Sequence, residues 1–220
     1  MKRFNMICSV VVFITIAVFL ITLSQNLVVR SSEVYAFYFN DSQAVSKLYT
    51  ELSGGDIAKG ISDFMNEWRP AEFQIYEDTG YDLQGIFDAD EGYNMLRIKL
   101  CVDISSILCV ISFILTASVY WYLIKSGEKK LLRTSCKSAL ALAAGFSAVY
   151  AVVLSTEGGR SWLAQLLKMR ELGEDSALLT ILGTDFVHMA IIFYVIITVI
   201  LMCVFAYVSD RLTRPPRIFY

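Results

Sequence analysis

The sequence predicts an α-helical membrane protein with four transmembrane helices, cytoplasmic N- and C-termini, and a small α/β extracytoplasmic domain between spans 1 and 2. Two observations predict this fold class. Four apolar stretches approach the roughly 20 residues that a helix needs to cross a bilayer core. Every strong cluster of Lys and Arg falls on the same side of these stretches, which is the pattern of cytoplasmic segments.

The four spans are expected at residues 6–23, 98–124, 139–155 and 186–208. Basic residues precede the first span, fill the connection 125–138 and occur in the tail 209–220, so these three segments are placed in the cytoplasm. An even number of spans then leaves residues 24–97 and 156–185 outside. The first span is expected to be retained, because its apolar run is longer than a usual signal sequence and no A-x-A-like cleavage site follows.

Composition restricts what the extracytoplasmic domain can bind. Residues 24–97 carry 13 Asp and Glu against 5 Lys and Arg, which argues against nucleic acid and against capture by anionic headgroups. None of the five cysteines lies there, so no disulfide framework is expected. With one histidine in the chain, no C-x-x-C and no phosphate-binding loop, no metal or cofactor is expected either.

The extracytoplasmic domain reads as mixed α and β. Residues 27–40, rich in Val, Tyr and Phe, predict an extended segment, and Asp41 or Ser42 is expected to cap a helix running to about Leu52. A second helix places Ile57, Ile61 and Phe64 on one face. Turn residues at 77–80 then predict a hairpin that continues to Leu83, after which the chain returns to the membrane.

Two apolar patterns further along the chain predict contacts. Alternating apolar and polar residues around Trp162 predict a short amphipathic helix with Trp162 at headgroup level. This helix either covers the bundle or presents a lipid-facing functional surface. In the third span, Ala141, Gly145 and Ala148 form a small-residue face suited to close helix packing.

Ionisable residues gather near the outer ends of the spans. Asp103, Asp185 and His188 are catalytic candidates, because charged groups in a bilayer are costly and usually face a cavity or a partner. His188 follows Asp185 by three residues, so the carboxylate is able to orient the imidazole. Glu157 and Arg160 lie at the same expected level. The alternative for each residue is structural pairing between helices.

A short motif carries a resemblance to a known family. The segment Phe87–Lys99 is similar to the pattern F-N-E-R-E-x-x-H-M-x-D-V-K, and it matches at Phe87, Glu91, Met95 and Lys99. Together with the order of spans and the tyrosine-containing exit after Asn26, this motif resembles the bacterial four-span integral membrane family that includes lipoprotein intramolecular transacylase. The resemblance implies acyl transfer, from the diacylglyceryl group of a lipoprotein to its N-terminal amine, at the outer face of the bacterial cytoplasmic membrane.

The chain departs from the family at the positions expected to react. Asn94 stands where the motif has histidine, Arg97 stands where it has aspartate, and a second family histidine falls near Val153 if Trp162 is the family's tryptophan. Acyl transfer to an amine needs a general base and a donor for the oxyanion. Asn94 can donate a hydrogen bond but cannot be that base, whereas Arg97 can stabilise an anion.

Three functions follow as hypotheses, and the sequence leaves open which is correct, what the substrate is and whether the chain is catalytic. The first is a relative that binds membrane lipid or lipoprotein at the outer leaflet without the usual catalysis, through Asn94, Arg97, Arg160 and Trp162. The second is an active lipoprotein acyltransferase whose base has moved, to His188 or Asp103. The third is a non-enzymatic scaffold or accessory protein whose acidic extracytoplasmic domain binds a protein partner.

Overall fold

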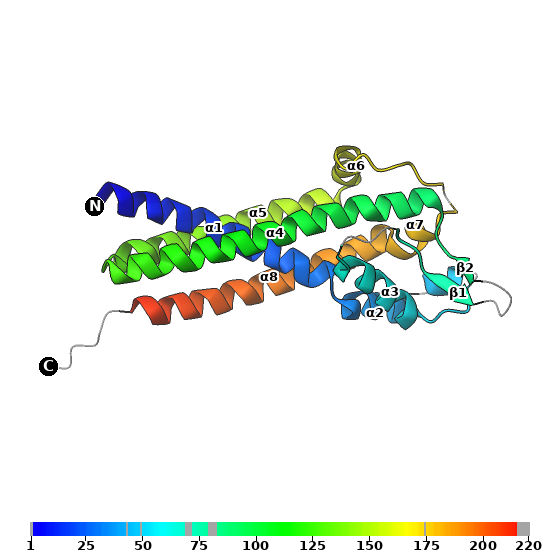
Figure 1. The fold of residues 1–220 in the computed structure, drawn as a ribbon, viewed down its shortest axis with the longest axis horizontal. Coiled ribbons are helices and arrows are strands. Elements are labelled where there is room, and N and C mark those ends of the chain that lie inside the picture. Colours follow the sequence, from blue (N-terminus) through cyan, green and yellow to red (C-terminus); the bar gives the residue numbers. More distant parts are fainter. Residues whose placement is uncertain are drawn as a thin grey trace. The chain divides into compact units, whose positions relative to one another are not determined.

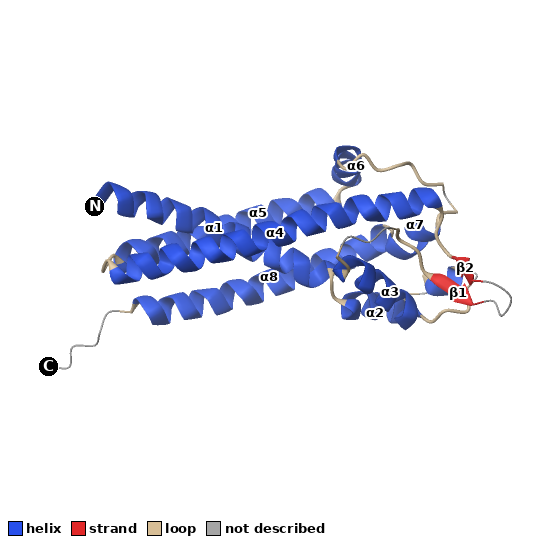
Figure 2. Cartoon of the chain, viewed as in Figure 1, coloured by secondary structure: helices blue, strands red, loops and turns tan. Residues whose placement is uncertain are grey.

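The computed structural model describes residues 2–42, 44–48, 50–68, 72–78, 83–173 and 175–214. These residues are mostly helical and include one two-stranded antiparallel sheet (Figures 1 and 2). The chain divides into two compact units. Unit 1 comprises residues 1–25, 105–150 and 195–220, and unit 2 comprises residues 26–104 and 151–194.

Four long helices run through the chain, and each is long and apolar enough to cross a membrane. They are α1 (Lys2–Val29), α4 (Ala89–Lys125), α5 (Lys129–Ser155) and α8 (Thr184–Thr213). The predicted number of four membrane-spanning helices is confirmed, and the four predicted spans fall inside these helices. Most helices extend beyond the apolar core into polar residues, because helical hydrogen bonding continues wherever the flanking residues are compatible with it.

Unit 1 has an apolar core, with a few side-chain hydrogen bonds between its helices. Val12, Ile16 and Leu20 of α1 are buried with Ala139 and Ala143 of α5. The packing face of α5 therefore differs from the expected one: Ala141, Gly145 and Ala148 are all exposed. The prediction was wrong because α1 contacts the neighbouring row of small side chains, and sequence spacing alone does not say which row meets a partner.

Unit 2 contains the shorter elements, which are α2 (Ser32–Asp41), a 3₁₀ turn (Val45–Lys47), α3 (Gly54–Asn66), β1 (Tyr76–Asp78), β2 (Leu83–Gly85), α6 (Glu157–Leu166) and α7 (Ala177–Leu182). Its core is aromatic and aliphatic. The Phe73 ring lies 4.7 Å from both the Phe64 and Phe87 rings, and Ile57 and Ile61 are fully buried beside them.

Two predicted elements of unit 2 are confirmed. Helix α3 buries Ile57, Ile61 and Phe64 on one face, and Ser53 caps it in a reciprocal capping box with Asp56. The hairpin is present, with Tyr76 opposite Gly85 in an antiparallel register. Of the predicted turn residues 77–80, residues 77 and 78 lie in β1, and residues 79 and 80 lie outside the described residues.

Two other predicted elements are wrong. Residues 27–40 are the end of α1 and the helix α2, not an extended segment. Burial of Tyr35 and Phe39 at helical spacing outweighs the β propensity of the local composition. The helix expected from Asp41 or Ser42 to about Leu52 is also absent from the described residues of this segment, where α2 ends at Asp41 and only the 3₁₀ turn follows.

Candidate functional site

The first turn of α4 starts with a reciprocal cap that orients the motif residues. The Asp88 carboxylate accepts the backbone N–H groups of Asp90 (2.9 Å) and Glu91 (2.7 Å), and the Glu91 carboxylate accepts the Asp88 N–H at 2.8 Å. This exchange satisfies donors that a helix start leaves unpaired. It also fixes the rotation of α4, so that residues 91 and 94 point into unit 2, where both are buried.

Glu91 anchors the start of α7 from this position. Only 2% of the residue is exposed, and its Oε1 accepts the Ser176 hydroxyl at 2.5 Å and the Leu178 N–H at 2.9 Å. A buried carboxylate is stable only with such donors around it. Glu91 therefore joins the starts of two helices that are far apart in the sequence.

Asn94 holds the backbone of the loop after α6. Its Nδ2 donates to the Arg170 carbonyl at 2.9 Å, and its Oδ1 accepts the Arg170 N–H at 2.7 Å. The residue is 1% exposed. One helical turn further on, Arg97 Nε donates to the Leu167 carbonyl at 2.8 Å. The two motif departures, Asn94 and Arg97, thus bind adjacent parts of one loop.

Two guanidinium groups lie against the ring of Tyr93 beside this loop. The Arg170 Cζ is 4.3 Å and the Arg97 Cζ is 5.7 Å from the ring centroid, distances at which cation–π attraction operates. Arg170 also forms an exposed ion pair with Asp90. We call Arg97, Arg170 and Tyr93 the basic cluster; it lies in a domain with an excess of acidic residues.

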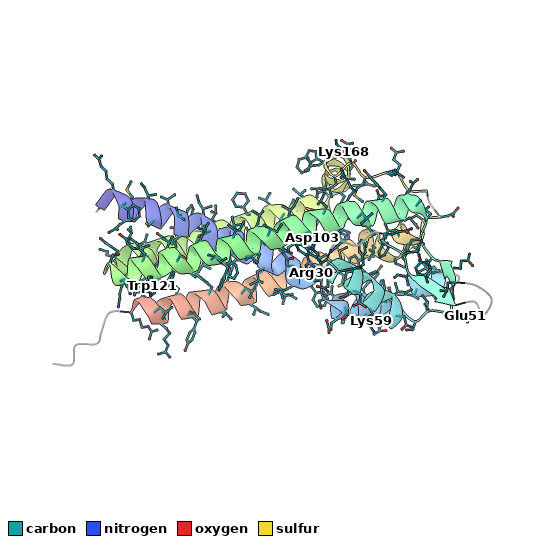
Figure 3. All side chains as sticks on the ribbon, in the orientation of Figure 1. Arg30, Glu51, Lys59, Asp103, Trp121 and Lys168 are labelled. Carbon is teal, nitrogen blue, oxygen red and sulfur yellow. The ribbon has the colours of Figure 1, made fainter. Side chains whose placement is uncertain are left out.

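Asp103, one of the catalytic candidates, lies in an ion-pair network. Its carboxylate is 2.7 Å from Arg30 Nη2 and 3.4 Å from Lys99 Nζ. Figure 3 labels Arg30 and Asp103. Both cations also donate to the Met65 carbonyl, and the Lys99 ammonium lies 5.7 Å from the Phe64 ring. The Lys99 side chain is 3% exposed, whereas that of Asp103 is 40% exposed. This arrangement is the pairing between helices that was the alternative to catalysis.

Arg160 and His188 meet at one backbone carbonyl. Arg160 Nη1 donates to the carbonyls of Leu154 (3.1 Å) and Ser155 (3.2 Å) at the end of α5. His188 Nε2 lies 3.5 Å from the same Ser155 oxygen. A hydrogen bond to a carbonyl requires the proton on Nε2, which leaves Nδ1 with its lone pair.

The remaining candidates occupy separate places. Trp162 on α6 is 58% exposed, as expected for an amphipathic helix that presents an aromatic ring. Asp185 lies in the first turn of α8. Partial burial and the charge of the Asp185 carboxylate raise the pKa of the Tyr38 hydroxyl.

Two pairs of candidates in unit 2 hold shared backbone segments: Asn94 and Arg97 hold the loop 167–170, and Arg160 and His188 meet at Ser155, whereas Asp103, Trp162 and Asp185 lie apart from these pairs. Sequence reasoning did not select Glu91, Lys99, Arg30 or Arg170, although the first two match the family motif. No sequence pattern pointed to Arg30 or Arg170, because their partners Asp103 and Asn94 lie 73 and 76 residues away in the sequence. Among the described residues, no three His, Cys, Asp or Glu side chains are placed to hold a metal ion.

Comparison with known proteins identifies the fold. No family model and no curated protein sequence matches the chain. The structure is similar to that of the membrane integral lipoprotein intramolecular transacylase Lit from Bacillus cereus, with a TM-score of 0.74, 10% identity, and coverage of 96% of this chain and 97% of that chain. A variant of Lit with a histidine replaced by arginine gives a TM-score of 0.75 at 11% identity, covering 96% and 92%.

This similarity confirms the resemblance predicted from the motif at 87–99. A variant of Lit with the same histidine replaced by alanine also matches, with a TM-score of 0.75 at 11% identity, covering 96% of this chain and 94% of that chain. The chain thus has the Lit fold over nearly its whole length. With its four apolar helices, it is a multi-pass membrane protein.

Proposed function

We propose that this protein binds lipid or lipoprotein in the outer leaflet of a bacterial cytoplasmic membrane without carrying out intramolecular acyl transfer. The observation that carries the proposal is the Asn94 contact. In the motif register, this position holds the family's histidine, and here it holds a carboxamide whose two ends are both engaged by the Arg170 backbone. Asn94 is assigned a positioning role: it fixes the loop that carries the binding groups.

Two carboxylates in or near the motif also have hydrogen-bond or ion-pair partners. Glu91 accepts three hydrogen bonds, and Asp103 is paired with two cations. A general base must reach the amine proton with a free lone pair at neutral pH. These two groups instead have clear structural partners, which supports binding over catalysis.

The binding surface is assigned to the basic cluster, Arg160 and Trp162. Among the described residues, Arg97 donates through Nε alone, so its Nη groups remain for the ester or peptide carbonyl oxygens of a bound lipid or lipoprotein. Trp162 and Leu166 are exposed on α6, where they are suited to insertion among headgroups and acyl chains. Residues 167–170, which Asn94 and Arg97 hold, follow directly after this helix.

The first experiment separates binding from chemistry on one substrate. The protein is expressed in a bacterium whose lipoproteins carry a diacylglyceryl cysteine with a free amine, and the N-terminal lipopeptide is analysed by mass spectrometry. We expect no transfer of an acyl chain to the amine. In parallel, a fluorescent diacylglyceryl lipopeptide is titrated into the purified protein in nanodiscs, where we expect saturable binding.

Binding is assigned to the site with paired variants. Arg97→Gln is expected to weaken lipopeptide binding by about tenfold, since a hydrogen bond to a charged group contributes roughly 1.5 kcal/mol or more. Arg97→Lys keeps the charge and should retain part of the affinity. Equal affinities for the wild type and both variants would contradict the assignment of this surface.

Active transfer with a relocated base is kept as a second candidate, because no hydrogen bond to His188 Nδ1 is seen among the described residues when Nε2 contacts Ser155. If the acyl shift is observed, His188→Ala should abolish it, while His188→Gln, which preserves an amide donor toward Ser155, should abolish it too. If neither transfer nor lipopeptide binding is found, the accessory-protein hypothesis follows. It predicts a partner that co-purifies and is lost when residues 24–97 are replaced.

A further inference from the structure

Unit 1 contains a groove that the proposed outer-leaflet site does not use. It has a volume of about 430 Å³, within the range of ligand pockets, and is formed by α1, α4 and α8. Its lining is largely aromatic and aliphatic, with Phe19 from α1, Phe113 and Trp121 from α4, and Phe205, Val208 and Leu212 from α8. All of these residues belong to unit 1.

The polar side chains of the lining are already satisfied within the unit. The Thr116 hydroxyl donates to Thr15 Oγ1 at 2.9 Å, and the Tyr120 hydroxyl donates to Ser209 Oγ at 3.1 Å. The groove therefore offers a ligand apolar surface and few polar partners. A lipid acyl chain is apolar in the same way, and acyl chains surround any helix that spans a membrane.

Positive charge flanks the groove at one end. Lys125 follows the lining residue Ile124, and Arg211 precedes the lining residue Leu212. The Tyr120–Ser209 hydrogen bond shows that these two helix ends lie at one level. Arg133 and Arg214 both pair with Asp210, whereas Lys125 and Arg211 have no carboxylate partner among the described residues.

Both of these cations contact aromatic rings, and Arg211 Nε and Nη2 also donate to the Tyr207 hydroxyl at 3.2 and 3.0 Å. The Lys125 ammonium lies 3.9 Å from the Trp121 ring centroid, and the Arg211 guanidinium lies 5.3 Å from the Tyr207 ring centroid. Cation–π attraction stabilises each charge beside its ring, and the apolar stems of Lys and Arg suit such charges to the headgroup level of a membrane. A phosphate is the anionic group that a lipid chain brings to this depth.

We propose that this groove binds one anionic phospholipid, with an acyl chain between Phe113, Trp121 and Phe205 and its phosphate between Lys125 and Arg211. Because the basic segments are predicted to face the cytoplasm, this lipid belongs to the inner leaflet. The site is thus separate from the proposed outer-leaflet site, and neither depends on the other.

The test uses Trp121 as the reporter. The chain has three tryptophans, so Trp68→Phe with Trp162→Phe leaves Trp121 alone. This protein is placed in nanodiscs of unlabelled phosphatidylcholine containing increasing fractions of either dibrominated phosphatidylglycerol or dibrominated phosphatidylcholine. We expect phosphatidylglycerol to quench Trp121 at a roughly thirtyfold lower fraction, since Lys125 and Arg211 together contribute about 2 kcal/mol, at about 1 kcal/mol for each basic side chain near a membrane surface.

Matched variants locate the effect. Ala117 lines the groove, so Ala117→Phe should fill it and remove the preference, whereas Leu115→Phe on the exposed face of the same helix should keep it. Lys125→Gln with Arg211→Gln should also remove the preference. Equal quenching by both lipids, or a preference that survives Ala117→Phe, would overturn the proposal and indicate general boundary lipid.

A second measurement covers the case in which the reporter protein does not fold. Native mass spectrometry of the wild type released from mixed phosphatidylglycerol and phosphatidylcholine micelles should show one retained phosphatidylglycerol, and Ala117→Phe should lose it. A spectrum with a second copy of the chain and no lipid would overturn the proposal, since the groove would then be an interface between copies.

Discussion

The Asn94 carboxamide binds both polar groups of the Arg170 backbone, at 2.9 and 2.7 Å, and so pairs α4 with a loop 76 residues away. This pairing is buried. The family motif has a histidine at this position. Here the two hydrogen bonds of Asn94 fix the Arg170 backbone instead, and so they determine where the Arg170 side chain lies.

Replacing Asn94 should therefore destabilise the loop before it affects anything else. Asn94→Ala leaves a buried backbone donor and acceptor unpaired and should cost about 2 kcal/mol. Hydrogen exchange at residues 167–170 should rise in the same variant. Gln165→Ala, at an exposed position of α6, is the control and should leave both measurements unchanged.

Asn94→His tests whether the family residue alone restores chemistry. An imidazole cannot donate to the Arg170 carbonyl and accept from the Arg170 N–H at the same time, as the carboxamide does, so the contact with Arg170 should be lost. We expect no acyl transfer in the lipopeptide assay and a lower melting temperature. Transfer by this single variant would show that only the base was missing.

Glu91 should be more costly to replace than its neighbour Asp90. Glu91→Gln removes a buried carboxylate from three donors, and hydrogen bonds to charged groups contribute about 1.5–3 kcal/mol. Asp90→Asn breaks only an exposed pair with Arg170, which is worth about 0–1 kcal/mol. Chemical unfolding in detergent measures both. Equal losses of unfolding free energy in the two variants would show that the Glu91 contacts do not stabilise the start of α7.

Two adjacent glycines at the start of α6 should respond in opposite directions. A Cβ at Gly159 would overlap the Val153 carbonyl oxygen, whereas nothing lies within 4 Å of a Cβ at Gly158. Gly159→Ala should therefore displace α6 and lower the melting temperature. Gly158→Ala should be neutral or stabilising, because alanine favours a helix interior by up to about 1 kcal/mol.

The cap of α3 predicts a dependence on pH. Hydrogen bonds from the Ser53 hydroxyl and backbone lower the pKa of the exposed Asp56 carboxyl below its usual range. A lowered folded-state pKa means that the stabilisation is present above about pH 4 and is lost as the pH falls through the lowered value. In the Asp56→Asn variant, the melting temperature should depend less steeply on pH in this window. An unchanged slope would mean that the cap does not contribute.

The sequence alone determined the elements whose signal is local. A run of apolar residues predicts a spanning helix because burying backbone polar groups in lipid requires helical hydrogen bonding, and all four spans were found this way. Helix α3 and the hairpin followed from spacing and turn residues. The motif at 87–99, together with the order of the spans, indicated the family resemblance that the structural comparison confirms.

Only the tertiary structure decided the contacts that give those elements their roles. Residues 32–40 are helical because Tyr35 and Phe39 are buried in a core that includes Ile57, which no local propensity reveals. Arg30 and Asp103 pair across 73 residues, and Asn94 meets Arg170 across 76. A hydrogen bond or ion pair depends on distances of about 3 Å between atoms, and the distance between residues remote in the sequence is set only when the chain packs.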